Sequence, residues 1–361
     1  LYEARFPNTS FLDFFWSWRA LMGGLFSVLL APMPEAKVYH AVSTGYAGLF
    51  LARARHETGR PAVLTEHGIY TNERRIEIAM ADWLYEVPEE GMSVDGGPSQ
   101  LRELWVSTFV SYSRSTYAAA DAIITLYEGN QAFQRQDGAD PDRMRIIPNG
   151  VDPERFAGLE PMEHPPTMAL IGRVVPIKDV KTFLRAVAQV RDQVPEAVAL
   201  IMGPTDEEPE YFEECRDLVA YMGLDNAVEF TGRVRLEDYL PRVDVNVLTS
   251  ISEGQPLVVL EAATAGIPAV ATDVGACRDI LYGDAREADD PLPPGGTVTP
   301  LSNPAATAEA VTALFWDRGW YRRCSEAIRE RVRRHYNKED LDAIYRDLYG
   351  HYMARATAER G

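Results

Sequence analysis

The stretch IGRVVPIKD (171–179) joins a short apolar run to a helical pattern. Gly172 lets the backbone approach a ligand closely, and Arg173 and Lys178 follow it in the same loop. The planar fork of an arginine and the point charge of a lysine at the carboxyl end of a strand suit a diphosphate. Two solvated cations on a surface loop would give the same residues, so the spacing alone leaves both interpretations open.

Outward from this loop, short apolar runs alternate with helical patterns from about residue 38 onward. Most runs are continuous rather than alternating, which is typical of strands buried on both faces. Strands and helices that alternate predict parallel sheets covered by helices. The expected strands are VYHAV (38–42), AVLTEH (62–67), AIITL (122–126), RIIPN (145–149), MALIGRV (168–174), VALIMG (198–203), VEFTG (228–232), DVNVLT (244–249) and AVATDV (269–274).

The proline-rich segment NGVDPERFAGLEPMEHPPT (149–167) interrupts this alternation. Such a break predicts a linker between two α/β domains, which we place at residues 1–160 and 161–337. Parallel sheets bind ligands at the carboxyl ends of their strands, so a cleft between the domains is the expected site.

Composition restricts the class of protein. The chain has 361 residues, enough for about two domains. Its 36 basic and 54 acidic residues give a net charge of −18, which argues against nucleic acid or anionic lipid as the main partner. Cys215, Cys277 and Cys324 lie far apart, so neither a disulfide framework nor a zinc knuckle is predicted. Sparse cysteine favours a reducing cytoplasm.

Two further segments receive structural interpretations. ALMGGLFSVLLA (20–31) is too short to cross a bilayer, which takes about 20 residues. We interpret it as a buried helix, with a docking face for a membrane partner as the alternative. A basic cluster on a late helix is interpreted as a solvated surface and comprises Arg329, Arg331, Arg333 and Arg334.

The stretch SEGQPLVVLEAATAGIPAVATDVG (252–275) carries two carboxylates and a tight turn. Pro256 suits the first turn of a helix, whose free N–H groups can hold a phosphate oxygen. Glu261 lies one to two turns into that helix and could accept from a ribose diol, whereas Glu253 lies in the loop and could accept from sugar hydroxyls. Two acids at this spacing are weak signals alone, because most carboxylates on helices are simply solvated.

Together these motifs resemble family 4 of the retaining glycosyltransferases, which have the GT-B fold. Arg173 and Lys178, followed by Glu253-x7-Glu261, match that family, as do IPNGVDPERF (147–156) and AGIPAVATDVG (265–275). TEHGIYTNERRIEIAMADW (65–83) with HAVSTGYAG (40–48) is similar to the glycosyltransferases of Pel exopolysaccharide biosynthesis, the PelF type. The resemblance implies two Rossmann-like domains with parallel sheets facing a central cleft, and a C-terminal helix (338–361) that crosses back to the N-terminal domain.

The resemblance also implies roles for individual residues. Arg173 and Lys178 would bind the donor diphosphate, Glu261 the ribose and Glu253 the donor sugar, while His67 would face that sugar from the N-terminal domain. Without the resemblance, His67 is more simply interpreted as a structural histidine. The full set expected to bind the nucleotide sugar is Gly172, Arg173, Lys178, Gly232, Val234, Glu253, Gly254, Gln255, Pro256, Leu257 and Glu261; the catalytic set is His67, Glu253, Arg173 and Lys178.

The activity implied is transfer of a sugar from a UDP-sugar to a growing polysaccharide or oligosaccharide acceptor, with retention and without a metal or other cofactor. The resemblance further implies a cytoplasmic enzyme at the inner membrane, associated with a Pel export complex and not with nucleic acid. A non-catalytic nucleotide-binding subunit of a polysaccharide synthase and a nucleotide-sugar epimerase are the alternatives. The family's N-terminal Gly-rich loop has no good match here, because Met22-Gly23-Gly24 lies inside an apolar run. We therefore expect the N-terminal domain to be incomplete.

Overall fold

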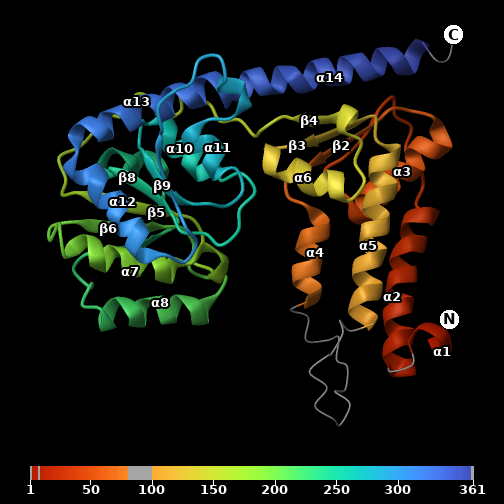
Figure 1. Ribbon diagram of the computed structural model, residues 1–361, viewed down its shortest axis with the longest axis horizontal. Helices are drawn as coiled ribbons and strands as arrows, with labels where there is room; N and C mark the ends of the chain where they lie inside the picture. Colours follow the sequence, from red (N-terminus) through yellow and green to blue (C-terminus); the bar gives the residue numbers. More distant parts are fainter. Residues whose placement is uncertain (1, 7–8, 80–99, 359–361) are drawn as a thin grey trace. The chain divides into compact units, whose positions relative to one another are not determined.

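The chain divides into two units, each built on its own parallel sheet (Figure 1). The computed structural model describes residues 2–6, 9–79 and 100–358. The first unit comprises Leu1–Ile147 and Ile344–Gly361, and the second Pro148–Ala343. The sequence placed these divisions at 160 and 337 instead. The linker groups with the second unit because the backbones of Val151 and Asn337 form a parallel bridge there.

The first unit holds a four-stranded sheet in the order β1-β2-β3-β4, with every strand parallel to its neighbours. All four strands were predicted, although β4 stops before Asn149. The strands and helices of this unit are α1 (Tyr2–Arg5), α2 (Phe11–Leu30), β1 (Tyr39–Ala41), α3 (Gly45–Thr58), β2 (Ala62–Glu66), α4 (Tyr70–Ala79), α5 (Gln100–Ala119), β3 (Ala122–Thr125), α6 (Glu128–Gln136), the 3-10 turn Pro141–Arg143 and β4 (Met144–Ile146).

Helices α2, α4 and α5 extend beyond the sheet of this unit (Figure 1) and surround an aromatic cluster that includes Phe14, Phe109 and Tyr112. The prediction of a helix over 20–31 is confirmed, but the prediction that this helix is buried is wrong. Leu21 is the only residue of that range that is fully buried, and Leu30 is 79% exposed. The structure describes no helix long and apolar enough to cross a membrane.

The last helix, α14 (Lys338–Ala358), belongs to the first unit from Ile344 onward. The hydroxyl of Tyr349 contacts Nδ1 of His40 at 2.5 Å, and Tyr345 lies within hydrogen-bond distance of Thr65. Tyr352 donates to the carbonyl of Asp121. The C-terminal helix expected at 338–361 is therefore present. From Ile344 onward it packs on β1, β2 and the start of β3 within this unit.

The second unit holds a six-stranded parallel sheet in the order β10-β9-β8-β5-β6-β7. Its strands are β5 (Thr167–Ile171), β6 (Val198–Met202), β7 (Val228–Gly232), β8 (Val245–Leu248), β9 (Ala269–Thr272) and β10 (Gly296–Thr299). Five of the six were predicted. The sequence missed β10 because GTVT is short, begins with glycine and carries two threonines rather than a continuous apolar run.

Side chains of β5 and β6 alternate between two apolar layers. Met168 and Leu170 pack with α7, α8 and α12 on one face, whereas Ala169 and Ile171 pack with α9 and α10 on the other. Helices therefore cover both faces, as the continuous apolar runs predicted (Figure 1). The helices are α7 (Val180–Arg191), α8 (Pro209–Tyr221), α9 (Leu236–Tyr239), α10 (Leu257–Thr264), α11 (Cys277–Tyr282), α12 (Pro304–Trp316) and α13 (Arg318–His335), with short 3-10 turns at Pro176–Lys178, Leu240–Arg242 and Ala285–Glu287.

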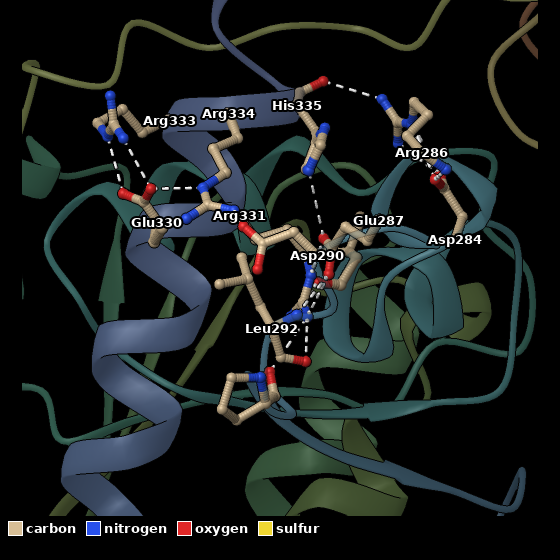
Figure 2. Close-up of polar contacts among 12 residues, drawn as sticks. Asp284, Arg286, Glu287, Asp290, Leu292, Glu330, Arg331, Arg333, Arg334 and His335 are labelled. Carbon is tan, nitrogen blue, oxygen red and sulfur yellow. Dashed lines mark hydrogen bonds and ion pairs between the residues drawn. The ribbon is translucent and has the colours of Figure 1, made fainter.

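One prediction about α13 is wrong. Arg331, taken from sequence as part of a solvated cluster, is the largest fully buried side chain among the described residues. Its guanidinium donates to both carboxylate oxygens of Glu287, at 2.6 and 3.0 Å (Figure 2). It also donates to the carbonyl of Leu281 at 2.9 Å. Arg333 and Arg334, by contrast, bind Glu330 at the exposed end of the helix.

Candidate active site

The order of the second sheet defines where a ligand would bind. Counting from β5, the order corresponds to 3-2-1-4-5-6, the doubly wound arrangement of dinucleotide-binding domains. The strand order reverses between β5 and β8, which are hydrogen-bonded neighbours. The loops that leave these two strands contain Arg173, Lys178 and Glu253. The sequence could not show that they are adjacent, because about 75 residues separate Lys178 from Glu253.

The two loops are joined by several hydrogen bonds. Lys178 Nζ lies 2.6 Å from Glu253 Oε1, and only 17% and 14% of the two side chains are exposed. Thr249 Oγ1 donates to the carbonyls of Lys178 and Asp179, each at 3.0 Å. The N–H of Ile251 donates to the carbonyl of Ile177 at 2.9 Å. The structure thus holds this predicted cation and the first predicted carboxylate together at the point where the strand order reverses.

Arg173 has a different partner. Its guanidinium bonds to Glu207 at 2.7 Å, in the loop after β6, and 53% of its side chain is exposed. Beside it, Gly172 passes so close to the end of β6 that a Cβ on Gly203 would lie 2.0 Å from the Gly172 carbonyl. The two predicted cations therefore share a loop but bind different carboxylates.

The turn before α10 is packed tightly against the loop after β9. Gly275 has a φ of +53°, and a Cβ there would lie 2.1 Å from the carbonyl oxygen of Gly254. The same carbonyl accepts from the N–H of Ala276 at 2.8 Å. Helix α10 begins after Pro256 with no side chain capping it, and Leu257 is 43% exposed. An uncapped helix start leaves N–H groups free for an anion.

Gln255 has a role that the sequence did not reveal. Its Nε2 donates to the carbonyl of Asn149 at 3.0 Å, and its Oε1 accepts from the N–H of Asn149 at 2.8 Å. Gln255 is 8% exposed, and its amide group pairs with the backbone of Asn149 as a neighbouring strand would. Any contact of Gln255 with a ligand would have to come from its backbone.

Glu261 lies on α10 and bonds to Arg155 Nη1 at 2.7 Å. Burial raises the pKa of the Glu261 carboxyl, Arg155 opposes that rise, and Glu237 adds to it. Arg155 stands in the quoted motif IPNGVDPERF, yet nothing in the sequence pairs it with a residue 106 positions later. Two further residues expected to bind the nucleotide sugar, Gly232 and Val234, lie at the end of β7 and just after it. Val234 packs partly buried against the α9–α10 face of the sheet.

In the first unit, His67 directly follows β2 and is exposed. Its carbonyl accepts from Asn130 Nδ2 at 3.4 Å. The preceding residue, Glu66, has no exposed surface. Thr44 Oγ1 donates to its Oε1, and Tyr117 OH and Gln134 Nε2 donate to its Oε2, at 3.1, 2.7 and 2.9 Å.

Burial raises the pKa of Glu66, and these donors together with the backbone of Tyr70 oppose that rise. Glu66 was not among the residues predicted from the sequence, although an acid at the end of a continuous apolar strand was a visible signal. The part of the chain that the structure describes contains no group of three or more His, Cys, Asp or Glu arranged to hold a metal ion.

Comparison with known proteins gives the second unit a family. Residues 165–317 match the family model described as "Glycosyl transferases group 1". This segment is a group 1 glycosyltransferase domain. Residues 1–142 match a domain of unknown function, DUF3492. The group 1 domain contains the Lys178–Glu253 pair and the whole six-stranded sheet.

Curated relatives agree with this assignment. The chain is 30% identical to the D-inositol 3-phosphate glycosyltransferase of Streptomyces coelicolor, over 61% of this chain and 59% of that protein. It is 26% identical to an MMP alpha-(1->4)-mannosyltransferase of Mycolicibacterium hassiacum, over 63% and 52%. Across the first relatives it matches, the chain spans about half of their length.

Among solved structures, Anabaena HepE in complex with UDP has a TM-score of 0.67 at 16% identity, covering 91% of this chain and 81% of that one. Sucrose-phosphate synthase from Thermosynechococcus elongatus has a TM-score of 0.66 at 21% identity, over 89% and 74%. The predicted fold class, GT-B with two Rossmann-like domains, is thereby confirmed.

Proposed function

We propose that this protein is a retaining glycosyltransferase that moves a sugar from a UDP-sugar to a hydroxyl of a polysaccharide or oligosaccharide acceptor. The observation that carries the proposal is the Lys178–Glu253 pair, held at 2.6 Å where the strand order of a group 1 glycosyltransferase domain reverses. A doubly wound sheet binds its ligand at that point. The pair presents a cation for phosphate and a carboxylate for sugar hydroxyls.

In the proposed reaction the bond between the anomeric carbon and the diphosphate oxygen breaks, and the acceptor hydroxyl forms a new bond on the same face. Negative charge grows on the diphosphate, which takes the acceptor's proton. Lys178, Arg173 and the N–H groups at the start of α10 would stabilise that charge. Arg173 would exchange Glu207 for phosphate, a change that costs little because this ion pair is exposed.

The remaining assignments extend the proposal. Glu253 would accept from the donor sugar, Glu261 from the ribose and His67 would face the sugar from the first unit, while Gly232 and Val234 would meet the base. Fixed cations would supply the charge stabilisation that a metal ion gives elsewhere, so no metal is needed. For the acceptor we propose a Pel-type exopolysaccharide, on the resemblance of residues 40–48 and 65–83, with the enzyme in the cytoplasm beside an inner-membrane export complex.

A matched pair of lysines tests the diphosphate site. Lys178→Ala is expected to weaken UDP binding in calorimetry and to lower turnover roughly 100-fold or more, the cost typical of a lost charge-stabilising donor. Lys181→Ala is the control, because Lys181 also bonds a carboxylate at 2.6 Å, Glu214, but lies on α7. Equal UDP affinity in the two variants would remove the assignment.

Product analysis separates the alternatives. A transferase releases UDP faster when acceptor is present, whereas an epimerase converts the donor without one, and a non-catalytic subunit binds the nucleotide without turnover. The acceptor assay compares oligosaccharides of the Pel type with inositol phosphate, because relatives carry the name D-inositol 3-phosphate glycosyltransferase. Transfer to inositol phosphate alone would overturn the polysaccharide assignment.

A further inference from the structure

The contact between Arg155 and Glu261 joins two segments that the proposed function uses differently. Glu261 lies on α10, the helix that begins at the proposed phosphate site, whereas Arg155 lies in the linker turn that follows Val151. Arg155 Nη1 donates to Glu261 Oε1 at 2.7 Å. Glu261 Oε2 accepts from none of the residues that the structure describes.

Arg155 is held in place by the turn around it. Asp152 Oδ1 accepts from the N–H of Glu154 at 2.9 Å, and the carbonyl of Asp152 accepts from the N–H of Arg155 at 3.2 Å. Phe156, 1% exposed, anchors the turn in the same apolar cluster as Ala262 of α10. The guanidinium carbon of Arg155 lies 4.7 Å from the centre of the Phe156 ring, a cation–π contact that limits its rotation.

We infer that Arg155 is a positioning residue for the nucleotide: it holds one oxygen of Glu261 and leaves the other to accept from the ribose hydroxyls. This inference rests on the proposed function. An ionised carboxylate is an acceptor only, whereas a protonated one becomes a donor on one oxygen and accepts less well. Arg155 therefore acts on nucleotide binding through the charge and the orientation of Glu261, without touching the ribose.

The charges around Glu261 explain why it needs this support. Burial and the nearby Glu237 both favour the protonated form, and Arg155 favours the ionised form. On α13, which packs against α10, Arg329 donates to the carbonyl of Ala265 and so is directed at the end of α10. Arg155 is the cation that bonds to Glu261 in the described part of the chain.

The experiment measures affinity against pH for two probes, UDP and inorganic pyrophosphate, which lacks ribose. In Arg155→Met the apolar stem still covers Phe156 but the charge is gone, so the carboxyl of Glu261 should protonate at higher pH. As the pH is lowered from 8 toward 5, we expect the UDP affinity of this variant to begin falling at a higher pH than that of the parent. A rise of about one pKa unit would make its loss approach about tenfold more than the parent's at the acid end. Pyrophosphate affinity should be unchanged, and Arg155→Lys should restore most of the parent profile.

A matched control is Arg242→Met, because Arg242 also stacks on an aromatic ring, that of Tyr239 at 4.6 Å, with no carboxylate bonded to it among the described residues. Its UDP profile should match the parent. Overlapping profiles for Arg155→Met and the parent would overturn the inference, as would an equal loss for UDP and pyrophosphate, which would assign Arg155 to the phosphates. If the parent binds neither probe, the proposed function itself fails. If it binds both but Glu261→Gln leaves UDP affinity unchanged, only the ribose assignment fails.

Discussion

Replacing Arg331 with methionine tests the buried ion pair between Arg331 and Glu287 (Figure 2). Arg331 bonds both carboxylate oxygens of Glu287, and the two side chains are only 1% and 5% exposed. Arg331 also donates to carbonyls at the end of α11 and in the loop before β10, those of Leu281, Leu292 and Pro293. Methionine fills a similar length but donates nothing, so the substitution leaves Glu287 as a buried carboxylate without its cation.

The expected cost follows from that burial. Removing one partner of a buried ion pair typically costs about 3–5 kcal/mol, because the remaining charge is uncompensated. For a unit of about 200 residues, each kcal/mol shifts the melting temperature by about 2–4 °C. Arg331→Met should therefore lower the melting temperature of the second unit by roughly 6–20 °C.

The measurement is thermal unfolding followed by calorimetry, with Arg333→Met as the matched control. Arg333 lies two residues along the same helix and bonds Glu330, but in solvent, where ion pairs contribute little. Adding Glu287→Leu to Arg331→Met should recover part of the loss, since it removes the uncompensated charge while the carbonyls stay unpaired. If Arg331→Met melts within about 2 °C of Arg333→Met, the burial argument is refuted.

Two other substitutions follow from the structure. Gly275→Ala should cost about 1–3 kcal/mol more stability in urea unfolding than Gly223→Ala. Both glycines have positive φ, but only at 275 would a Cβ meet backbone, the Gly254 carbonyl at 2.1 Å. Equal losses would contradict the close approach. Glu66→Gln tests a pH dependence. Because burial raises the pKa of Glu66 in the folded protein, the native state binds more protons than the unfolded chain between the ordinary pKa near 4.3 and the raised value. The contribution of Glu66 to stability therefore declines as pH rises through that window. The stability of the parent minus that of Glu66→Gln should therefore fall across that window and level off above it; a difference that grows with pH would show that the hydrogen bonds to Tyr117 and its neighbours outweigh burial.

Local patterns determined much of this protein. Short apolar runs mark nine of the ten strands. Most of these runs are continuous, because a strand buried on both faces needs apolar side chains in both directions. The motifs around Lys178, Glu253 and Glu261 resembled a family of glycosyltransferases, family 4, and residues 165–317 match the family model described as "Glycosyl transferases group 1". These features can be recognised in the sequence because each depends on residues close together in the chain.

Pairings between distant residues were decided by the tertiary structure. The sheet order brings the loops of β5 and β8 together, and only then does Lys178 meet Glu253. Helical spacing places Arg331 on a face of α13, but whether that face meets solvent or Glu287 depends on how the loop before β10 folds over it. The same is true of two other pairs, Gln255 with Asn149 and Arg155 with Glu261. Burial and the choice of partner follow from packing between distant segments, and the order of residues along one segment does not encode that packing.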